Sequence, residues 1–126
     1  MQLNSVHHVA ILVKDYALSR HFYVDVLGFC VLRENFRPEK GTYKLDLALD
    51  GLELELFSAP DAPERPTQPE ALGLRHLAFC TADVAATVAE LAALGIVCEP
   101  IRTDPYSGGA YTFFFDPDGL PLELHE

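Results

Sequence analysis

Two histidines and two glutamates recur at one interval along this chain of 126 residues. His8 is followed 68 positions later by His76, and Glu55 is followed 68 positions later by Glu123. Imidazole nitrogens and carboxylate oxygens together form a ligand set that suits Zn²⁺, Ni²⁺, Co²⁺, Mn²⁺ or Fe²⁺ and can leave positions open for water or substrate. The repeat therefore predicts one divalent metal per site, with His8, Glu55, His76 and Glu123 as its ligands.

These four residues belong to a longer internal repeat. Six of seven residues agree between the segments 50–56 and 118–124, and Asp15 recurs as Asp83. The pattern predicts two copies of a β-α-β-β-β module, at 5–58 and 75–126, joined by a proline-rich linker at 59–74 within a single domain. The expected strands are 6–13, 29–36, 43–49 and 52–57 in the first copy and 75–81, 97–102, 111–115 and 120–124 in the second.

Each copy is also expected to hold one helix, at 16–27 and at 84–94. Asp15 and Asp83 are placed to cap their first turns, and Gly28 and Gly95 to end them. Because the two glycines are 67 rather than 68 positions apart, we expect helices that differ in length by one residue. The interval of 68 is expected to return before Tyr43 and Tyr111.

Alternation along the strands predicts which side chains share a face of the sheet. Leucines alternate with polar residues at 43–49 and 52–57, so one face packs under the helices and the other carries the four ligands. Two such modules, related by a pseudo-two-fold axis, predict an α+β protein in which the four ligands meet on the concave face of the sheet. Lys44, Asp46, Thr112 and Phe114 are expected on this face as residues that shape a substrate pocket. Cys80 shares its predicted face with His76, although packing is its default role.

Other ionisable residues are assigned structural or solvated roles. His7 is out of phase with the repeat and is interpreted as a structural histidine, whereas Glu53 is expected in solvent or at the rim. His125, near the end of the chain, is assigned to the surface. Glu99 and Glu126 are interpreted as solvated charges.

Composition excludes several classes of function. The net charge of −10 and the lack of Lys/Arg clusters argue against nucleic acid and against an anionic membrane surface as partners. No apolar run is long enough to cross a bilayer, and the polar first residues lack a signal-peptide core. The three cysteines have no CxxC spacing, which favours buried thiols in a reducing, cytoplasmic compartment.

Several motifs resemble the vicinal oxygen chelate superfamily, and within it the glyoxalase I-like proteins, also grouped as the glyoxalase, bleomycin resistance and dioxygenase family. The resemblance covers nearly the whole chain, and it is carried by the segments 8–11, 19–29, 54–56, 75–79 and 116–124. It implies an eight-stranded cup around a divalent metal, usually in a homodimer. It also implies ligand roles for the same four residues that the repeat selects.

The resemblance further implies proton abstraction next to a carbonyl of a small-molecule substrate. Glu55 or Glu123 would act as general base and then as acid, and the metal would stabilise an enediolate. Glyoxalase I proper usually has an arginine where Leu12 stands and an asparagine where Ala59 stands. Since those two groups hold glutathione, dependence on glutathione does not follow for this chain.

Three other functions fit the same resemblance. An iron-dependent dioxygenase would use two histidines and one carboxylate, and Glu55 would then occupy the position left for oxygen or substrate. A non-catalytic binding or resistance protein of the bleomycin-resistance type typically lacks the ligand set. A thiol transferase would use three ligands and leave Glu55 superfluous.

Overall fold

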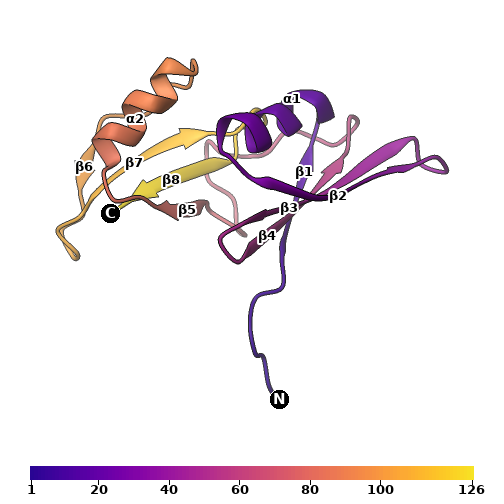
Figure 1. Cartoon of the computed structure of the whole chain (residues 1–126), viewed down its shortest axis with the longest axis horizontal. Coiled ribbons are helices and arrows are strands. Elements are labelled where there is room, and N and C mark those ends of the chain that lie inside the picture. Colours follow the sequence, from indigo (N-terminus) through magenta and orange to yellow (C-terminus); the bar gives the residue numbers. More distant parts are fainter. The chain divides into compact units, whose positions relative to one another are not determined.

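The computed structural model describes all residues from Met1 to Glu126, which form two compact units, Met1–Pro63 and Glu64–Glu126. The first unit contains β1 (Val9–Val13), α1 (Tyr16–Arg20), the π-helical turn η1 (His21–Val26), β2 (Cys30–Arg37), β3 (Thr42–Leu49) and β4 (Leu52–Ser58) (Figure 1). The second unit contains β5 (Leu77–Cys80), α2 (Val84–Ala93), β6 (Arg102–Thr103), β7 (Ala110–Phe115) and β8 (Pro121–His125). No helix has both the length and the apolar character needed to cross a membrane.

Each unit is built around one mixed four-stranded sheet. The strand orders are β1-β4-β3-β2 and β5-β8-β7-β6, and in both sheets the first two strands of that order are parallel while the other pairs are antiparallel. The repeated order confirms the α+β class and the two related modules that the sequence predicts.

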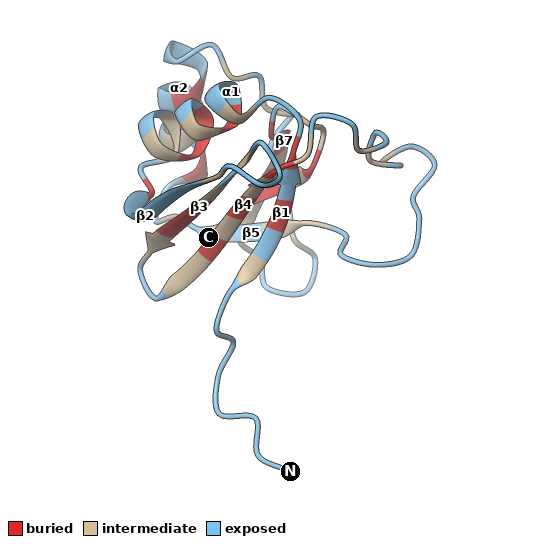
Figure 2. Cartoon of the chain, turned by 90° about the vertical axis from the view of Figure 1, so that its right-hand side faces the viewer, coloured by how far each residue is buried: buried red, intermediate tan, exposed pale blue.

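The buried face of the first sheet follows the predicted alternation. Leu45, Leu47, Leu54 and Leu56 are completely buried, and Figure 2 shows buried and exposed residues alternating along β1. Burying a leucine side chain stabilises the fold by about 1.5–3 kcal/mol. Because side chains alternate along a strand, these leucines turn one face of the sheet to the core. The other face is left for polar side chains, among them Lys44, whose side chain is 28% exposed.

Both helices begin where the sequence predicts. The Asp15 carboxylate accepts a hydrogen bond from the Leu18 amide, and the Asp83 carboxylate accepts one from the Ala86 amide. The first helical segment is one residue longer, and it accommodates that residue in the π-helical turn η1, where the Leu27 amide bonds to the Phe22 carbonyl. The predicted difference in helix length is therefore confirmed.

The interval of 68 returns later in the chain than predicted. Asp50 and Gly51, both with positive φ, make a two-residue turn between β3 and β4. In the second unit the Asp116 amide bonds to the Leu120 carbonyl at 3.0 Å, so the turn spans three residues, 117–119. This extra residue restores the interval of 68 positions only after β7. Residues of β7 therefore correspond to residues of β3 that lie 67 positions earlier in the chain.

The one-residue difference reverses the faces predicted for β7. Thr112 pairs with Leu124 and Phe114 pairs with Leu122, and both are completely buried at the core positions that Leu45 and Leu47 occupy in the first unit. The prediction that Thr112 and Phe114 face a cup was therefore wrong. Tyr111 and Phe113 occupy the polar face instead, and Phe113 pairs directly with Glu123.

Three predicted strands are shorter than expected. β1 and β5 begin at Val9 and Leu77, immediately after His8 and His76. The strand predicted at 97–102 is reduced to β6, because the preceding segment is held to β7 by two isolated hydrogen bonds around Glu99. The Glu99 amide donates to the Phe113 carbonyl, and the Thr112 hydroxyl donates to the Glu99 carbonyl.

Candidate functional site

The first His–Glu pair joins the start of β1 to the middle of β4. Parallel pairing sets Ala10 opposite Glu55, and His8 lies on the same face two residues before Ala10. His8 Nε2 is 3.2 Å from Glu55 Oε2, and the two side chains are 37% and 16% exposed. His8, which directly precedes β1, is thus positioned by the register between β1 and β4.

The second pair repeats this geometry in the second unit. Ala78 lies opposite Glu123, and His76 Nε2 is 2.8 Å from Glu123 Oε2. The Phe113 ring packs against the His76 ring in an edge-on arrangement with 5.2 Å between centroids. The two predicted ligands of each unit are therefore in contact, and in both units it is Nε2 that faces the carboxylate.

These separations fit two donors to one ion. Ligands about 2.1 Å from a divalent metal lie about 3.0 Å apart at octahedral angles and about 3.4 Å apart at tetrahedral angles, so the observed separations are on average nearer the octahedral value. Within either unit, no group of three or more His, Cys, Asp and Glu side chains is arranged to hold a metal. Each unit thus supplies two candidate ligands of the predicted four.

Charged neighbours hold Glu55 in the first unit. The Lys44 ammonium lies 2.9 Å from Glu55 Oε1 and 2.9 Å from Asp46 Oδ1, and Arg33 Nε lies 2.9 Å from Asp46 Oδ2. Burial alone raises the pKa of the Asp46 carboxyl, but hydrogen bonds from Lys44 and Arg33 outweigh it and the net shift is downward. The hydrogen bonds to Asp46 and Glu55 raise the pKa of Lys44, which stays protonated.

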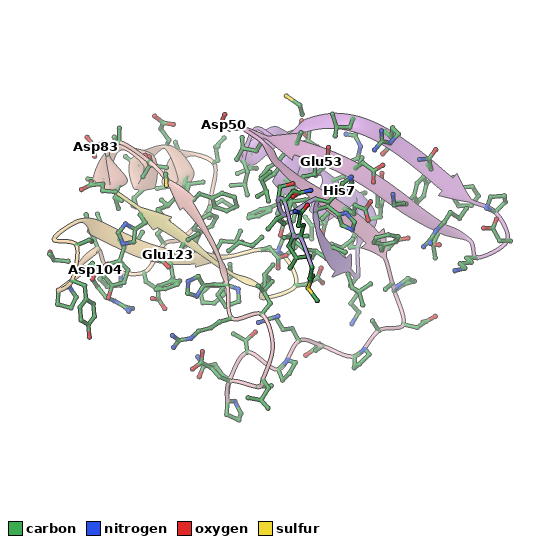
Figure 3. The ribbon with its side chains drawn as sticks, turned by 90° about the horizontal axis from the view of Figure 1, so that it is seen from below. His7, Asp50, Glu53, Asp83, Asp104 and Glu123 are labelled. Atoms are coloured by element: carbon green, nitrogen blue, oxygen red, sulfur yellow. The ribbon has the colours of Figure 1, made fainter.

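Aromatic side chains replace this charged network in the second unit. Tyr111 and Phe113 stand where Lys44 and Asp46 stand in the first unit, and Glu123 contacts the His76 imidazole. Glu123 and Asp104, both labelled in Figure 3, line a cavity of about 840 Å³ that lies wholly within the second unit. Lys44 and Asp46 lie beside the His8–Glu55 pair, and their role in a substrate pocket stays a prediction, whereas Thr112 and Phe114 are in the core.

The sequence reasoning missed Tyr111, Phe113 and Arg102. Residues 110–115 read Ala-Tyr-Thr-Phe-Phe-Phe, so hydrophobicity does not reveal which face is buried. The signal that could have found them is the hairpin, since Pro117-Asp-Gly119 is one residue longer than Asp50-Gly51.

The remaining candidates lie outside the ligand pairs. His7 is exposed, and its Nδ1 is 2.8 Å from His8 Nδ1. Cys80 is an exposed free thiol at the end of β5, and Glu53 is half-buried on β4. His125, which was predicted to lie at the surface, also contacts two side chains. Its Nε2 is 3.2 Å from Asp104 Oδ2, and its ring stacks on Tyr111.

Known proteins are similar to this chain in sequence and in fold. Residues 5–124 match the model of the Glyoxalase/Bleomycin resistance protein/Dioxygenase superfamily. The chain is 58% identical to the uncharacterized protein YwkD of Bacillus subtilis (strain 168), over all of this chain and 99% of that one. It is 30% identical to Glyoxylase I 4 of Arabidopsis thaliana, over 98% of this chain and 71% of that protein.

A solved structure agrees with the fold. The crystal structure of the glyoxalase family protein from Enterococcus faecalis superimposes with a TM-score of 0.92 at 55% identity, and the alignment covers both chains completely. Paired β-α-β-β-β units, each with a His–Glu pair on its polar face, define a protein of the vicinal oxygen chelate type. The chain belongs to the Glyoxalase/Bleomycin resistance protein/Dioxygenase superfamily.

Proposed function

We propose that this chain is a divalent-metal-dependent lyase or isomerase of the glyoxalase I type. Its substrate would be a small oxygen-chelating carbonyl compound, such as a hemithioacetal or a related 2-oxo or 2-hydroxy compound. His8, Glu55, His76 and Glu123 would bind one ion, with the two pairs supplied by one chain or by two chains of a cytoplasmic homodimer. The observation that carries this proposal is the recurrence of a His Nε2–Glu carboxylate contact, at 3.2 and 2.8 Å, in both units.

The reaction requires a proton to leave one carbon and return to its neighbour. A divalent ion at this site would supply Lewis-acid stabilisation of the negative charge that develops on the substrate oxygens. A glutamate carboxylate takes the proton from the carbon next to the carbonyl, and the resulting carboxylic acid returns it to the adjacent carbon. The substrate hydroxyl proton passes to the former carbonyl oxygen in the same turnover, so the net change is an isomerisation in which no electrons are exchanged with a second reactant.

Glu123 is the better candidate for the base. Glu55 holds an ammonium on Oε1 and an imidazole on Oε2, so movement of this carboxylate breaks an ion pair with Lys44. Glu123 contacts the His76 imidazole and forms no ion pair with a lysine or arginine, and its other neighbours in the cavity include aromatic rings. We therefore assign proton transfer to Glu123 and a fixed ligand role to Glu55.

The name of the Arabidopsis relative, Glyoxylase I 4, supports this class of reaction over the alternatives. A dioxygenase would consume oxygen with a catechol after anaerobic loading with iron. A non-catalytic binding protein would hold its ligand equally well after Glu55→Gln substitution and would contain no stoichiometric metal.

Elemental analysis of the isolated protein tests the metal site. His8→Ala and His76→Ala should each reduce metal affinity by at least about tenfold. His7→Ala is the matched control, because His7 neighbours a ligand in sequence and is outside the ligand set; it should retain the metal. Full occupancy in His76→Ala protein would contradict the assignment.

Activity is tested by screening 2-oxoaldehydes with several thiols for isomerisation. Glu123→Gln should lower kcat by about 10²- to 10⁴-fold, the usual contribution of a general base. Glu55→Gln should instead act mainly by weakening metal retention. Equal losses of kcat in both variants at full metal occupancy would overturn the assignment of the base to Glu123.

A further inference from the structure

The cavity of the second unit contains a cation that the proposed reaction does not use. Its walls include the His76–Glu123 pair, the Tyr111 and Phe113 rings, and Arg102. A cavity of about 840 Å³ is of the size that takes small molecules. The ionisable groups among its lining residues are Arg65, Arg75, His76, Arg102, Glu70, Glu99, Asp104 and Glu123.

Arg102 lies over the aromatic wall of this cavity. Its guanidinium carbon is 5.9 Å from the centroid of the Tyr111 ring and 5.9 Å from that of Phe113. The Phe113 centroid is in turn 5.2 Å from that of His76. A molecule that contacts the His76–Glu123 pair at one end and Arg102 at the other therefore needs to span no more than the sum of these two distances.

Arg102 also keeps hydrogen-bonding capacity for a ligand. One of its terminal nitrogens donates to Glu99 at 2.5 Å, which orients the guanidinium, and the side chain is 49% exposed. A guanidinium has five N–H donors, so this single bond leaves donors for a second oxyanion. The Phe113 ring packs against His76, and Arg102 lies over that ring without an ion pair to Glu123.

The other two arginines of the cavity each make one hydrogen bond more than Arg102. Arg75 uses two nitrogens on the two oxygens of Glu70, at 2.5 and 3.3 Å. Arg65 donates to the Leu74 and Arg75 carbonyls. In the first unit the nearest cation to a ligand pair, Lys44, is bound to Glu55 itself. Arg102 is thus the cation of the cavity with the most free donors and with an aromatic surface that holds it in place.

We propose that Arg102 recognises an oxyanion on the substrate, so that the substrates of this protein are small carbonyl compounds that also carry a carboxylate or phosphate group. This inference rests on the proposed function for the position of the reacting carbonyl. Arg102 itself contacts the anionic end of the substrate and is a specificity-determining residue.

Two matched pairs of probes test the inference by titration calorimetry. 2-Oxoglutarate and 2-oxopentanoate differ in one terminal carboxylate, and dihydroxyacetone phosphate and dihydroxyacetone differ in one phosphate. The wild-type, metal-loaded protein should bind the more anionic member of at least one pair about 10- to 100-fold more tightly. The pair that responds tells whether the group is a carboxylate or a phosphate.

Arg102→Ala should remove this preference and leave binding of the less charged member unchanged. Arg102→Lys should retain part of it, because an ammonium keeps the charge without the paired donors. Arg75→Ala, at the arginine bound to Glu70, is the matched control and should keep the preference. No preference in the wild-type protein, or equal loss of preference in Arg75→Ala and Arg102→Ala, would overturn the inference.

The same titrations on metal-free protein separate this inference from the proposed function. A charge preference that depends on Arg102 in both forms supports the inference even if no isomerase activity is found. Metal retention and isomerase activity without any charge preference would support the proposed function and reject the role of Arg102.

Discussion

Substitution of Lys44 by methionine tests the charged network around Glu55. The Lys44 ammonium lies 2.9 Å from both Asp46 and Glu55, and Asp46 is only 2% exposed. A hydrogen bond to a charged group contributes about 1.5–3 kcal/mol, and we expect a loss near the lower value, about 1.5 kcal/mol, because Arg33 still neutralises Asp46. For a domain of this size such a loss lowers Tm by roughly 5–9 °C.

Urea denaturation followed by far-UV circular dichroism measures this loss. Lys40→Met, in the exposed turn between β2 and β3, is the control and should change stability by less than about 0.5 kcal/mol. The double variant Lys44→Met/Asp46→Asn should be more stable than the sum of the two single losses implies, because it no longer buries a carboxylate with a missing partner. Additive losses would refute the claim that Lys44 and Asp46 act as a pair.

The pH dependence gives an independent check. The folded state lowers the pKa of Asp46, so its ionised form stabilises the protein above the unfolded pKa near 4, and this contribution disappears as the pH falls through the lower folded value. Lys44→Met should reduce the part of acid destabilisation that comes from Asp46. An unchanged slope of stability against pH between about pH 2 and 5 would mean that Lys44 does not set this ionisation.

Three further predictions concern single side chains. Asp83→Ala should cost about 1 kcal/mol in urea denaturation, since the Ala86 amide loses its acceptor; an unchanged midpoint would exclude a capping role. The Glu126 carbonyl and Asp104 raise the pKa of His125. The stability difference between wild type and His125→Asn should therefore be largest below about pH 6.5 and should shrink as the pH rises above the folded pKa. A stability difference that grows with pH would be inconsistent with this. Burial and the Glu34 carboxylate raise the pKa of Tyr16, so absorbance titration of Tyr16→Phe should lose the tyrosine that ionises last; loss of an early-ionising one would contradict this.

Much of the fold follows from local sequence signals. Capping aspartates, terminal glycines and leucine alternation identify helices and strands, because each signal acts through contacts within a few residues. The repeat adds the long-range pairing, since His8–Glu55 and His76–Glu123 must occupy equivalent positions if the two units share one strand order. The contact within each pair was therefore accessible from the sequence, whereas the joint binding of one ion by both pairs stays a proposal.

The features that sequence reasoning did not predict depend on register and on long side chains. The faces of β7 are set by one additional residue in the 117–119 turn, and a run of aromatic residues gives no periodic signal to correct the error. The strand expected at 97–102 is reduced to β6, and the segment before it is held to β7 by two hydrogen bonds around Glu99, one of them from the Thr112 hydroxyl. The position of Arg102 over Tyr111 and Phe113 follows only once that register is known.

In the second unit, a change in the length of the β7–β8 hairpin affects the side chains of β7 but not the His76–Glu123 pair. Insertion or deletion of one residue at 117–119 exchanges every side chain that β7 offers to the cavity, because alternate residues of a strand face opposite ways. His76 directly precedes β5 and Glu123 lies in β8. Because β5 pairs with β8, a shift of β7 leaves the contact between these two residues in place. A one-residue change in this hairpin can therefore replace the aromatic wall of the cavity in one mutational step while the His76–Glu123 contact is kept.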